Sequence, residues 1–223
     1  MGFEVEVLDN HPRDAAARIA AALPPHGSVV LTGGTTAEKI YPFLALEDTD
    51  WSRIEVLFSD ERCVPPDDPA SNYKMAHDLL LDRAGPAAVH RMRGEDDPDA
   101  AAAAYSDEIA DLVAADLDLV LLGMGADAHV GAMFPDSTAI NETERLCRAV
   151  DRPDGMKGLT LTPPALLSGV KVLLLVTGDA KAETVRRVIE GNEDVVDCPA
   201  RLLAGHPDVT FLLDQAAGSK LGA

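Results

Sequence analysis

The sequence predicts an α/β protein of three layers, in which a mainly parallel sheet is covered by helices on both faces. Short apolar segments typical of buried strands alternate with segments of helical character along the chain. The 223 residues contain no linker, low-complexity tract or internal repeat, and this length suffices for one substantial core. We therefore expect residues 1–223 to form a single domain.

The first predicted elements are a strand, a helix and a second strand. Apolar and acidic residues alternate over residues 3–8, as they do in a strand with one exposed face. An alanine-rich helix is expected over residues 14–23, and Pro24-Pro25 ends it because proline lacks the amide hydrogen that a helix needs. Residues 28–32 are short and apolar, which indicates a buried strand.

The second helix is expected to open at Thr35, because Thr35 and Glu38 have the spacing of a capping box. Pro42 lies within this helix, where it is expected to cause a kink. Residues 54–58 form the next predicted strand, and the polar, proline-rich residues 60–71 are predicted to form a loop.

Ser71 is a suitable N-cap for a helix that continues through Leu81. A further helix is expected over residues 99–112, and the apolar residues 117–122 indicate another buried strand. The remaining predicted elements are a strand over 170–176, a helix over 180–189, a short helix over 199–204 and a strand over 209–213.

Composition and charge exclude several classes of protein. An apolar fraction of 47% fits a globular chain, and no apolar run is long enough to span a bilayer. The net charge of −19 disfavours nucleic acids and anionic membranes as partners. The N-terminus lacks the basic and apolar segments of a signal peptide, so we expect a cytoplasmic protein.

The cysteines predict neither a disulfide framework nor a metal centre. The chain has three widely spaced cysteines, Cys63, Cys147 and Cys198. Their odd number and wide spacing argue against a set of disulfides and against a zinc site. Cys63 lies near a candidate site, but no basic partner that would activate it as a nucleophile is evident. We therefore expect no bound metal.

Polar loops follow three of the predicted strands. They are Gly33-Gly-Thr-Thr36, Ser59-Asp-Glu-Arg62 and the loop from Gly123 to His129. In open α/β sheets, ligands bind outside the carboxyl ends of the strands, so we expect these three loops to converge on one site.

The first two loops suit a phosphorylated ligand. The start of the second predicted helix offers backbone amides and two hydroxyls to a phosphate, from Gly33, Gly34, Thr35 and Thr36. A tight turn between strand and helix would also explain these residue types. The loop is not a P-loop, because no Gly-Lys-Ser/Thr follows. Arg62 carries a planar donor fork that matches phosphate, while Asp60 could orient Arg62 or bind sugar hydroxyls. A surface ion pair between these two residues is the simpler alternative.

The third loop carries the strongest catalytic candidate, His129, because an ordinary histidine pKa of about 6.5 suits a general base. It follows Gly123 and Gly125, which let backbone amides approach a ligand and which we include among the predicted substrate-binding residues. Asp127 is close enough in sequence to orient the ring of His129. The loop also matches the dinucleotide motif G-x-G-x-x-A, but Pro135 ends the next segment too soon for the long helix required. No serine lies in the G-x-S-x-G motif of serine hydrolases.

Together these loops resemble the 6-phosphogluconolactonase family over nearly the whole chain. The resemblance implies the Rossmann-type fold shared with ribose-5-phosphate isomerase and glucosamine-6-phosphate deaminase. The similar segments occur in the family's order and are Thr32-Gly-Gly-Thr-Thr36, Phe58-Ser-Asp-Glu-Arg-Cys-Val-Pro65, Ser71-Asn-Tyr73, Gly123-Met-Gly-Ala-Asp-Ala-His-Val-Gly-Ala-Met-Phe-Pro135, Leu159-Thr-Leu-Thr-Pro163, Val176-Thr-Gly-Asp-Ala-Lys-Ala182 and Pro199-Ala-Arg-Leu-Leu203.

The resemblance implies hydrolysis of 6-phospho-D-glucono-1,5-lactone to 6-phospho-D-gluconate in the oxidative pentose phosphate pathway. It also implies that His129 activates water and that neither a metal nor an organic cofactor takes part. A sugar phosphate is thus the expected partner, and we expect a monomer or a small homo-oligomer. Arg62 and the amides of residues 33–36 are the expected phosphate ligands.

Two segments depart from the family pattern. Ala128 stands where the family usually has glycine between Asp and His, and alanine resists a positive φ angle. Residues 151–158 replace a family stretch that contains lysine and arginine. Arg152 or Lys157 is available to supply the missing charge, and we include Lys157 among the predicted substrate-binding residues.

Two other functions are open from the sequence. An aldose–ketose isomerase or amino-sugar deaminase on the same fold would need a carboxylate base, for which Asp60 or Glu61 is available. A non-catalytic sugar-phosphate sensor would need the loops without a base. Such a sensor would normally bring a DNA-binding module, and no segment of the sequence fits one.

Overall fold

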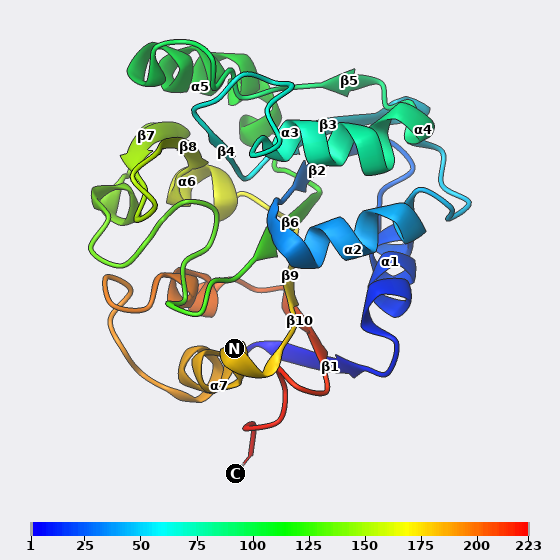
Figure 1. Cartoon of the computed structure of the whole chain (residues 1–223), viewed down its shortest axis with the longest axis vertical. Coiled ribbons are helices and arrows are strands. Elements are labelled where there is room, and N and C mark those ends of the chain that lie inside the picture. The colour runs from blue at the N-terminus through cyan, green and yellow to red at the C-terminus, as the bar shows by residue number, and fades with distance from the viewer. Residues whose placement is uncertain (1, 223) are drawn as a thin grey trace.

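The computed structural model describes residues 2–222 and confirms the three-layer α/β class (Figure 1). The central sheet has seven strands in the order β1-β10-β9-β6-β2-β3-β5, and all neighbouring pairs are parallel. The strands are β1 (Glu4–Leu8), β2 (Gly27–Leu31), β3 (Ile54–Phe58), β5 (Ala88–Val89), β6 (Leu119–Gly123), β9 (Lys171–Val176) and β10 (Val209–Asp214).

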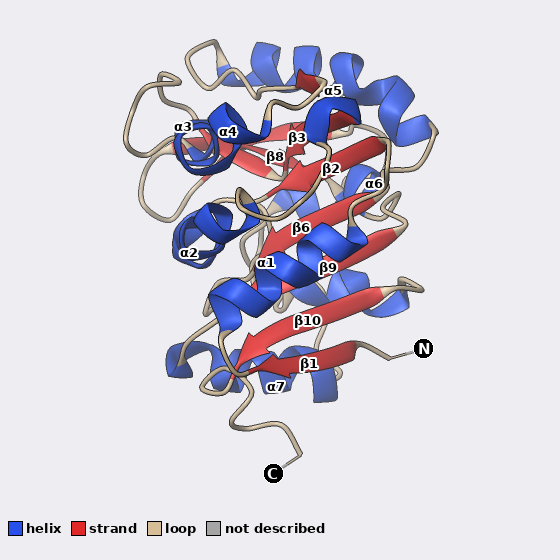
Figure 2. Cartoon of the chain, turned by 90° about the vertical axis from the view of Figure 1, so that its right-hand side faces the viewer, coloured by secondary structure: helices blue, strands red, loops and turns tan. Residues whose placement is uncertain are grey.

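One face of the sheet is covered by the N-terminal helices (Figure 2). Buried side chains such as Ile19, Tyr41 and Phe58 form the core between these helices and the sheet. The covering elements are α1 (His11–Ala22), α2 (Gly34–Leu44), α3 (Asn72–Ala76), the π-helical turn η2 (His77–Leu81) and α4 (Asp82–Ala84).

The other face is covered by helices and by a second, smaller sheet. Tyr105, Phe211 and many aliphatic side chains form the core on this side. The small sheet is antiparallel, with β4 (Asp60–Arg62), β8 (Lys157–Leu161) and β7 (Cys147–Asp151) in that order. The helical elements on this side include α5 (Pro98–Ala114), α6 (Pro163–Leu166), α7 (Ala182–Glu190) and the 3₁₀ helix η5 (Pro199–Gly205).

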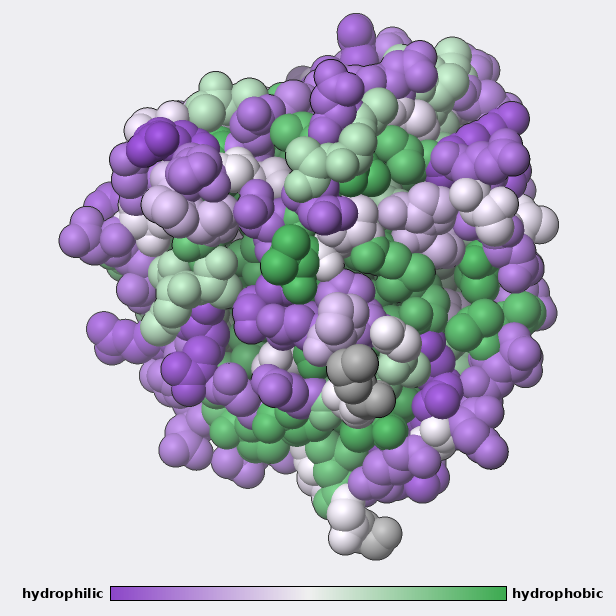
Figure 3. Space-filling model, turned by 180° about the vertical axis from the view of Figure 1, so that it is seen from behind, coloured by the Kyte–Doolittle hydropathy of each residue, from purple (hydrophilic) through white to green (hydrophobic). Residues whose placement is uncertain are grey.

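Three short 3₁₀ turns complete the described elements, namely η1 (Trp51–Arg53), η3 (Thr138–Asn141) and η4 (Asp179–Lys181). The face in Figure 3 is mostly hydrophilic, with apolar residues in scattered patches. No helix within residues 2–222 is both long and apolar enough to cross a membrane.

The structure confirms the six predicted strands of the large sheet to within two residues at each end. The capping box predicted at Thr35 and Glu38 is wrong, because α2 begins one residue earlier and its N-cap, Gly33, makes no side-chain cap. The helix continues through Pro42 to Leu44. The N-cap role predicted for Ser71 is confirmed, since its hydroxyl accepts a hydrogen bond from the Lys74 amide.

The prediction of a continuous loop over residues 60–71 is wrong for its first three residues, which form β4. This strand pairs with β8, which was not predicted. β4 is polar and only three residues long, and its strand conformation depends on pairing with residues far along the chain. Local sequence patterns carry no signal for such tertiary pairing. The short strands β5 and β7 and the helix α6 were also not predicted.

The buried carboxylate of Glu61 fixes β4 to the start of α3. The residue is 3% exposed, and its two oxygens accept hydrogen bonds at 2.7–2.8 Å from the Ser71 hydroxyl and from the backbone amides of Asn72, Tyr73 and Arg62. Buried acceptors that satisfy several donors are costly to remove, because each donor is left unpaired. Glu61 therefore holds the polypeptide on both sides of Arg62 in a defined position.

We expect Glu61→Ala to lower the free energy of unfolding by about 3 kcal/mol, because it leaves buried donors unpaired. Glu38→Ala is the matched control, since Glu38 is exposed on α2 and should change the value by less than about 0.5 kcal/mol. Urea denaturation followed by circular dichroism measures both. Equal effects of the two substitutions would contradict the anchoring role of Glu61.

Candidate functional site

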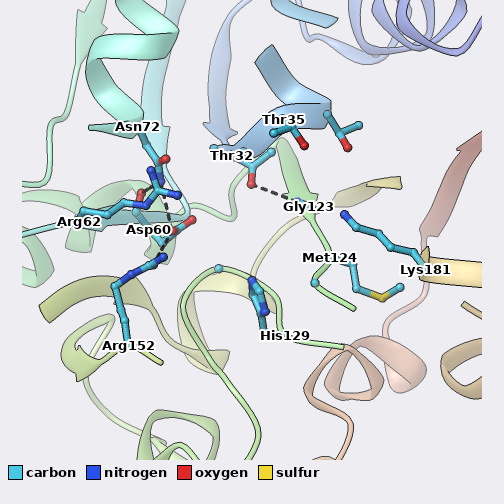
Figure 4. Close-up of a pocket in the computed structure, with 15 residues that line it drawn as sticks. Thr32, Thr35, Asp60, Arg62, Asn72, Gly123, Met124, His129, Arg152 and Lys181 are labelled. Atoms are coloured by element: carbon cyan, nitrogen blue, oxygen red, sulfur yellow. Dashed lines mark hydrogen bonds and ion pairs between the residues drawn. The ribbon is translucent and has the colours of Figure 1, made fainter. Parts of the chain in front are cut away.

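A cavity of about 180 Å³ opens at the carboxyl ends of β2, β3 and β6 (Figure 4). The loops that follow these adjacent strands meet there, and a fourth contribution comes from the segment after β9. Nine of the predicted site residues line the cavity, and they are Gly33, Gly34, Thr35, Thr36, Asp60, Arg62, Gly123, Gly125 and His129.

His129 is held by a hydrogen bond between its Nδ1 and Oδ1 of Asp127 at 2.6 Å. The same carboxylate oxygen accepts a hydrogen bond from the His129 amide at 3.2 Å. Burial opposes ionisation of Asp127, but the hydrogen bonds and charge of His129 outweigh it and hold the pKa of Asp127 below its ordinary value. Donation from Nδ1 to a carboxylate leaves Nε2 as the proton acceptor of a neutral imidazole. Asp127 itself is not among the residues that line the cavity.

The loop around His129 requires glycine at position 125. A Cβ atom there would lie 2.1 Å from Nδ1 of His129 and 2.4 Å from Oδ1 of Asp127, so any side chain would displace the pair. Ala128 has φ of 68°, which shows that alanine adopts the left-handed conformation that glycine would adopt without strain. Ala128 therefore carries local backbone strain in place of the usual glycine.

The amides of the glycine loop are already engaged within the protein. The Gly123 amide donates to Oγ1 of Thr32 at 3.1 Å, and the Gly125 amide donates to the His129 carbonyl at 3.0 Å. These two amides are thus not free to stabilise negative charge on a ligand. Any such stabilisation must come from other donors that line the cavity.

Asp60 and Arg62 face the cavity but do not pair with each other. The Asp60 carboxylate accepts hydrogen bonds from Oγ of Ser59 at 2.8 Å and from Nδ2 of Asn72 at 3.2 Å. Nη1 of Arg62 donates to the Ala70 carbonyl at 2.5 Å, and the guanidinium has no carboxylate within ion-pair distance among residues 2–222. The alternative of a surface ion pair between Asp60 and Arg62 is therefore wrong.

Arg152, rather than Lys157, is the second positively charged side chain beside Arg62 in the cavity wall. The Arg152 side chain is 11% exposed, and its Nη1 lies 4.0 Å from Oδ2 of Asp60. Lys157 lies outside the cavity, because it pairs with Asp151 across the β7–β8 hairpin and is 56% exposed. The sequence-based placement of Lys157 among the substrate ligands is therefore not supported by its position.

Lys181 is a cavity residue that the sequence analysis did not select. It is the last residue of η4, the turn that follows β9, and it extends into the cavity from the side opposite to Arg62 and Arg152 (Figure 4). Burial lowers the pKa of Lys181, and the negative charges of Asp127 and Asp214 counteract this effect. The sequence does carry an indication of this lysine, because Lys181 lies in the segment from Val176 to Ala182 that resembles the family. Other unselected lining residues are Thr32, Asn72, Met124 and Gly131.

The arrangement suits a ligand with an anionic end and a reactive end. Arg62 and Arg152 lie together beside Asp60, whereas His129 lies between them and Lys181 (Figure 4). The first turn of α2 adds backbone amides that no side-chain cap engages. Within residues 2–222, no three His, Cys, Asp or Glu side chains are grouped to hold a metal ion.

Comparison with known proteins assigns the chain to a family. Residues 5–211 match the profile of the family described as glucosamine-6-phosphate isomerases/6-phosphogluconolactonase. The chain belongs to this family. It is 35% identical to a 6-phosphogluconolactonase of Streptomyces coelicolor, over 93% of this chain and 89% of the relative. It is 36% identical to a 6-phosphogluconolactonase of Mycobacterium tuberculosis, over 91% of this chain and 89% of the relative.

Solved structures of the family have the same fold. A 6-phosphogluconolactonase from Trypanosoma cruzi superimposes with a TM-score of 0.87 at 27% identity, covering 100% of this chain and 99% of that chain. A monomeric glucosamine-6-phosphate deaminase superimposes with a TM-score of 0.84 at 26% identity, covering 97% of this chain and 99% of that chain. Two chemistries therefore occur on this backbone, and the side chains of the site must distinguish them.

The different positions of Arg152 and Lys157 give a direct test with inorganic phosphate. We expect Arg152→Ala to raise the dissociation constant for phosphate about tenfold, because a guanidinium in the cavity wall makes charge-assisted hydrogen bonds to phosphate. The matched control, Lys157→Ala, removes an exposed cation and should change the constant less than about twofold. Isothermal titration calorimetry measures both constants. A larger loss with Lys157→Ala would show that phosphate binds elsewhere.

Proposed function

We propose that this protein hydrolyses 6-phospho-D-glucono-1,5-lactone to 6-phospho-D-gluconate, the lactonase step of the oxidative pentose phosphate pathway. The observation that carries the proposal is the Asp127-oriented His129, which lines a cavity together with Arg62, Arg152 and Lys181. Relatives that are 35% and 36% identical over most of their length bear the name 6-phosphogluconolactonase. The chain from residue 1 to residue 223 would act as one domain.

In the proposed complex the phosphate lies at the Arg62–Arg152 side of the cavity. Arginine binds phosphate through paired hydrogen bonds, and the uncapped amides at the start of α2 add further donors. Asp60 accepts hydrogen bonds from sugar hydroxyls on the same side. This remote binding places the lactone carbonyl near His129 and converts binding energy into a defined reacting geometry.

His129 then acts as the general base. Nε2 takes a proton from a water molecule while the water oxygen attacks the carbonyl carbon, and Asp127 stabilises the imidazolium that forms. The ring C–O bond breaks as the tetrahedral intermediate collapses, and the imidazolium returns its proton to the leaving ring oxygen. Lys181, which lines the same cavity as His129, stabilises the negative charge on the carbonyl oxygen. The amides of Gly123 and Gly125 do not take this role, because both donate hydrogen bonds within the protein.

A deaminase or isomerase reaction would need a carboxylate base in the cavity. Glu61 does not meet this need, because it is buried outside the cavity and accepts four hydrogen bonds from the protein. Asp60 lines the cavity and is the one carboxylate in its wall among residues 2–222. The superposition on a glucosamine-6-phosphate deaminase makes this the second candidate function.

Two assays separate the candidates. Freshly generated 6-phosphogluconolactone should be hydrolysed far faster than its spontaneous rate, whereas glucosamine 6-phosphate should release no ammonia. Ammonia release without lactonase turnover would establish the deaminase. Binding of 6-phosphogluconate without turnover of either substrate would favour a non-catalytic sensor. We also propose a cytoplasmic location, which the three free cysteines support. We further propose a monomer or small homo-oligomer that binds neither nucleic acid nor a membrane.

Replacing His129 should remove most of the catalysis. We expect His129→Ala to lower kcat at least about 100-fold, because it removes the general base. His26→Ala is the matched control, since His26 is exposed next to the amino end of β2, opposite to the site, and should leave kcat unchanged. Steady-state kinetics and circular dichroism are measured on the same preparations. Near-normal turnover by folded His129→Ala protein would exclude the base assignment.

Replacing Arg62 should affect the phosphorylated substrate selectively. We expect Arg62→Ala to lower kcat/KM for 6-phosphogluconolactone about 100-fold, but to lower kcat/KM for unphosphorylated glucono-1,5-lactone less than about threefold. The matched control is Arg83→Ala, because Arg83 also donates to a backbone carbonyl but is exposed and outside the cavity. If both lactones suffer equally, Arg62 acts on the reacting end or on loop structure.

A further inference from the structure

The aromatic ring of Phe134 contacts the two side chains that perform different tasks in the proposed reaction. Its centroid lies 4.5 Å from the centroid of the His129 imidazole, with 47° between the ring planes. The Arg152 guanidinium carbon lies 5.5 Å from the same centroid, within the range of a cation–π contact. Phe134 does not itself line the cavity that contains His129.

The backbone on both sides of Phe134 is held by hydrogen bonds. The Val130–Met133 turn closes through a hydrogen bond of 3.1 Å, and the Phe134 carbonyl accepts from the Ser137 amide at 2.9 Å. The Ala132 amide donates to the buried hydroxyl of Thr160 on β8 at 3.0 Å, which ties this segment to the small sheet. Phe134 is 8% exposed and is therefore packed on nearly all sides.

The hydrogen bonds of His129 and Arg152 leave part of their orientation undetermined. Nδ1 of His129 bonds to Asp127, whose side chain is 44% exposed, and Arg152 bonds to Asp154, whose side chain is 41% exposed. The His129 imidazole makes one such bond, whereas Nε and Nη2 of Arg152 both donate to Oδ2 of Asp154, at 3.2 and 3.1 Å. Contacts to one oxygen of a solvated carboxylate allow the ring or the guanidinium to tilt about that oxygen. A packed aromatic ring restricts that tilt, because planar cations and rings favour particular stacking geometries.

We propose that Phe134 is a positioning residue that sets the orientation of His129 and Arg152 together, and thereby the spacing between the water-activating and phosphate-binding ends of the site. This inference rests on the proposed function for its kinetic consequences. Because one ring serves both ends, its loss impairs turnover and phosphate recognition at once. In contrast, loss of a side chain that contacts only one end of the substrate would change either kcat or KM, but not both.

The test compares Phe134→Leu and Phe134→Tyr with the control Phe211→Leu. Phe211 is fully buried on β10, where its ring packs against Phe3 at 5.2 Å, and it lies outside the cavity. Phe134→Leu should lower kcat about tenfold for both 6-phosphogluconolactone and glucono-1,5-lactone, because a misoriented base is less effective. It should raise KM about threefold for the phosphorylated lactone alone, through loss of the cation–π contact to Arg152.

Phe134→Tyr retains the aromatic ring, so its kcat and KM should stay within about twofold of those of the unchanged protein. The same is expected of Phe211→Leu. The proposal is contradicted if folded Phe134→Leu keeps both parameters, if Phe211→Leu reproduces its effects, or if Phe134→Tyr is equally impaired. A fall in kcat without the selective rise in KM would also contradict it, because Arg152 would then be positioned independently. If Phe134→Leu does not fold, Phe134→Met takes its place.

A structural readout separates this inference from the proposed activity. The NOE signal between the His129 Cε1–H proton and the Gly125 α-protons depends on the tilt of the imidazole over Gly125, so it should change in Phe134→Leu and stay unchanged in Phe211→Leu. If the unchanged protein hydrolyses neither lactone, the proposed function fails, while this signal still reports whether Phe134 orients His129. An unchanged signal in Phe134→Leu would overturn the positioning role whatever the activity.

Discussion

The parallel order of β9, β6, β2 and β3 is the constraint on which the site depends. Because all four strands run in the same direction, their carboxyl ends lie at one edge of the sheet, and the segments that follow them share one cavity. Each strand supplies a different part of the site. β2 leads to the amides of α2, β3 to Asp60 and Arg62, β6 to His129, and β9 to Lys181. A change in strand order would separate groups that line one cavity.

Local charge explains how a protein with a net charge of −19 can bind an anion. At physiological ionic strength the screening length is about 8 Å, so carboxylates on distant surfaces contribute little to the potential in the cavity. Arg62, Arg152 and Lys181 lie in the cavity wall and act at contact distance. The Asp60 carboxylate reduces this positive charge, and in the proposed function it accepts hydrogen bonds from hydroxyl groups next to the phosphate.

Much of this arrangement could be predicted from the sequence, because it depends on local patterns. Buried apolar strands of the large sheet and glycine-containing turns at their ends are local features, and the loops around Gly33, Asp60 and His129 could be found from them. The small sheet could not be predicted, since β4 pairs with a strand about a hundred residues later in the chain. That pairing also decides which cation of residues 151–158 faces the cavity. β8 and β7 pair Lys157 with Asp151, which leaves Arg152 at the turn beside Asp60.

The central claim is that one cavity holds a sugar phosphate with its phosphate at Arg62 and Arg152 and its reacting carbon at His129. A crystal structure of the unchanged protein with bound 6-phosphogluconate tests it most directly. The account predicts phosphate oxygens within hydrogen-bond distance of both guanidinium groups, and the product carboxylate beside Nε2 of His129 and Nζ of Lys181. A ligand bound in the reverse orientation, or outside this cavity, would contradict the account.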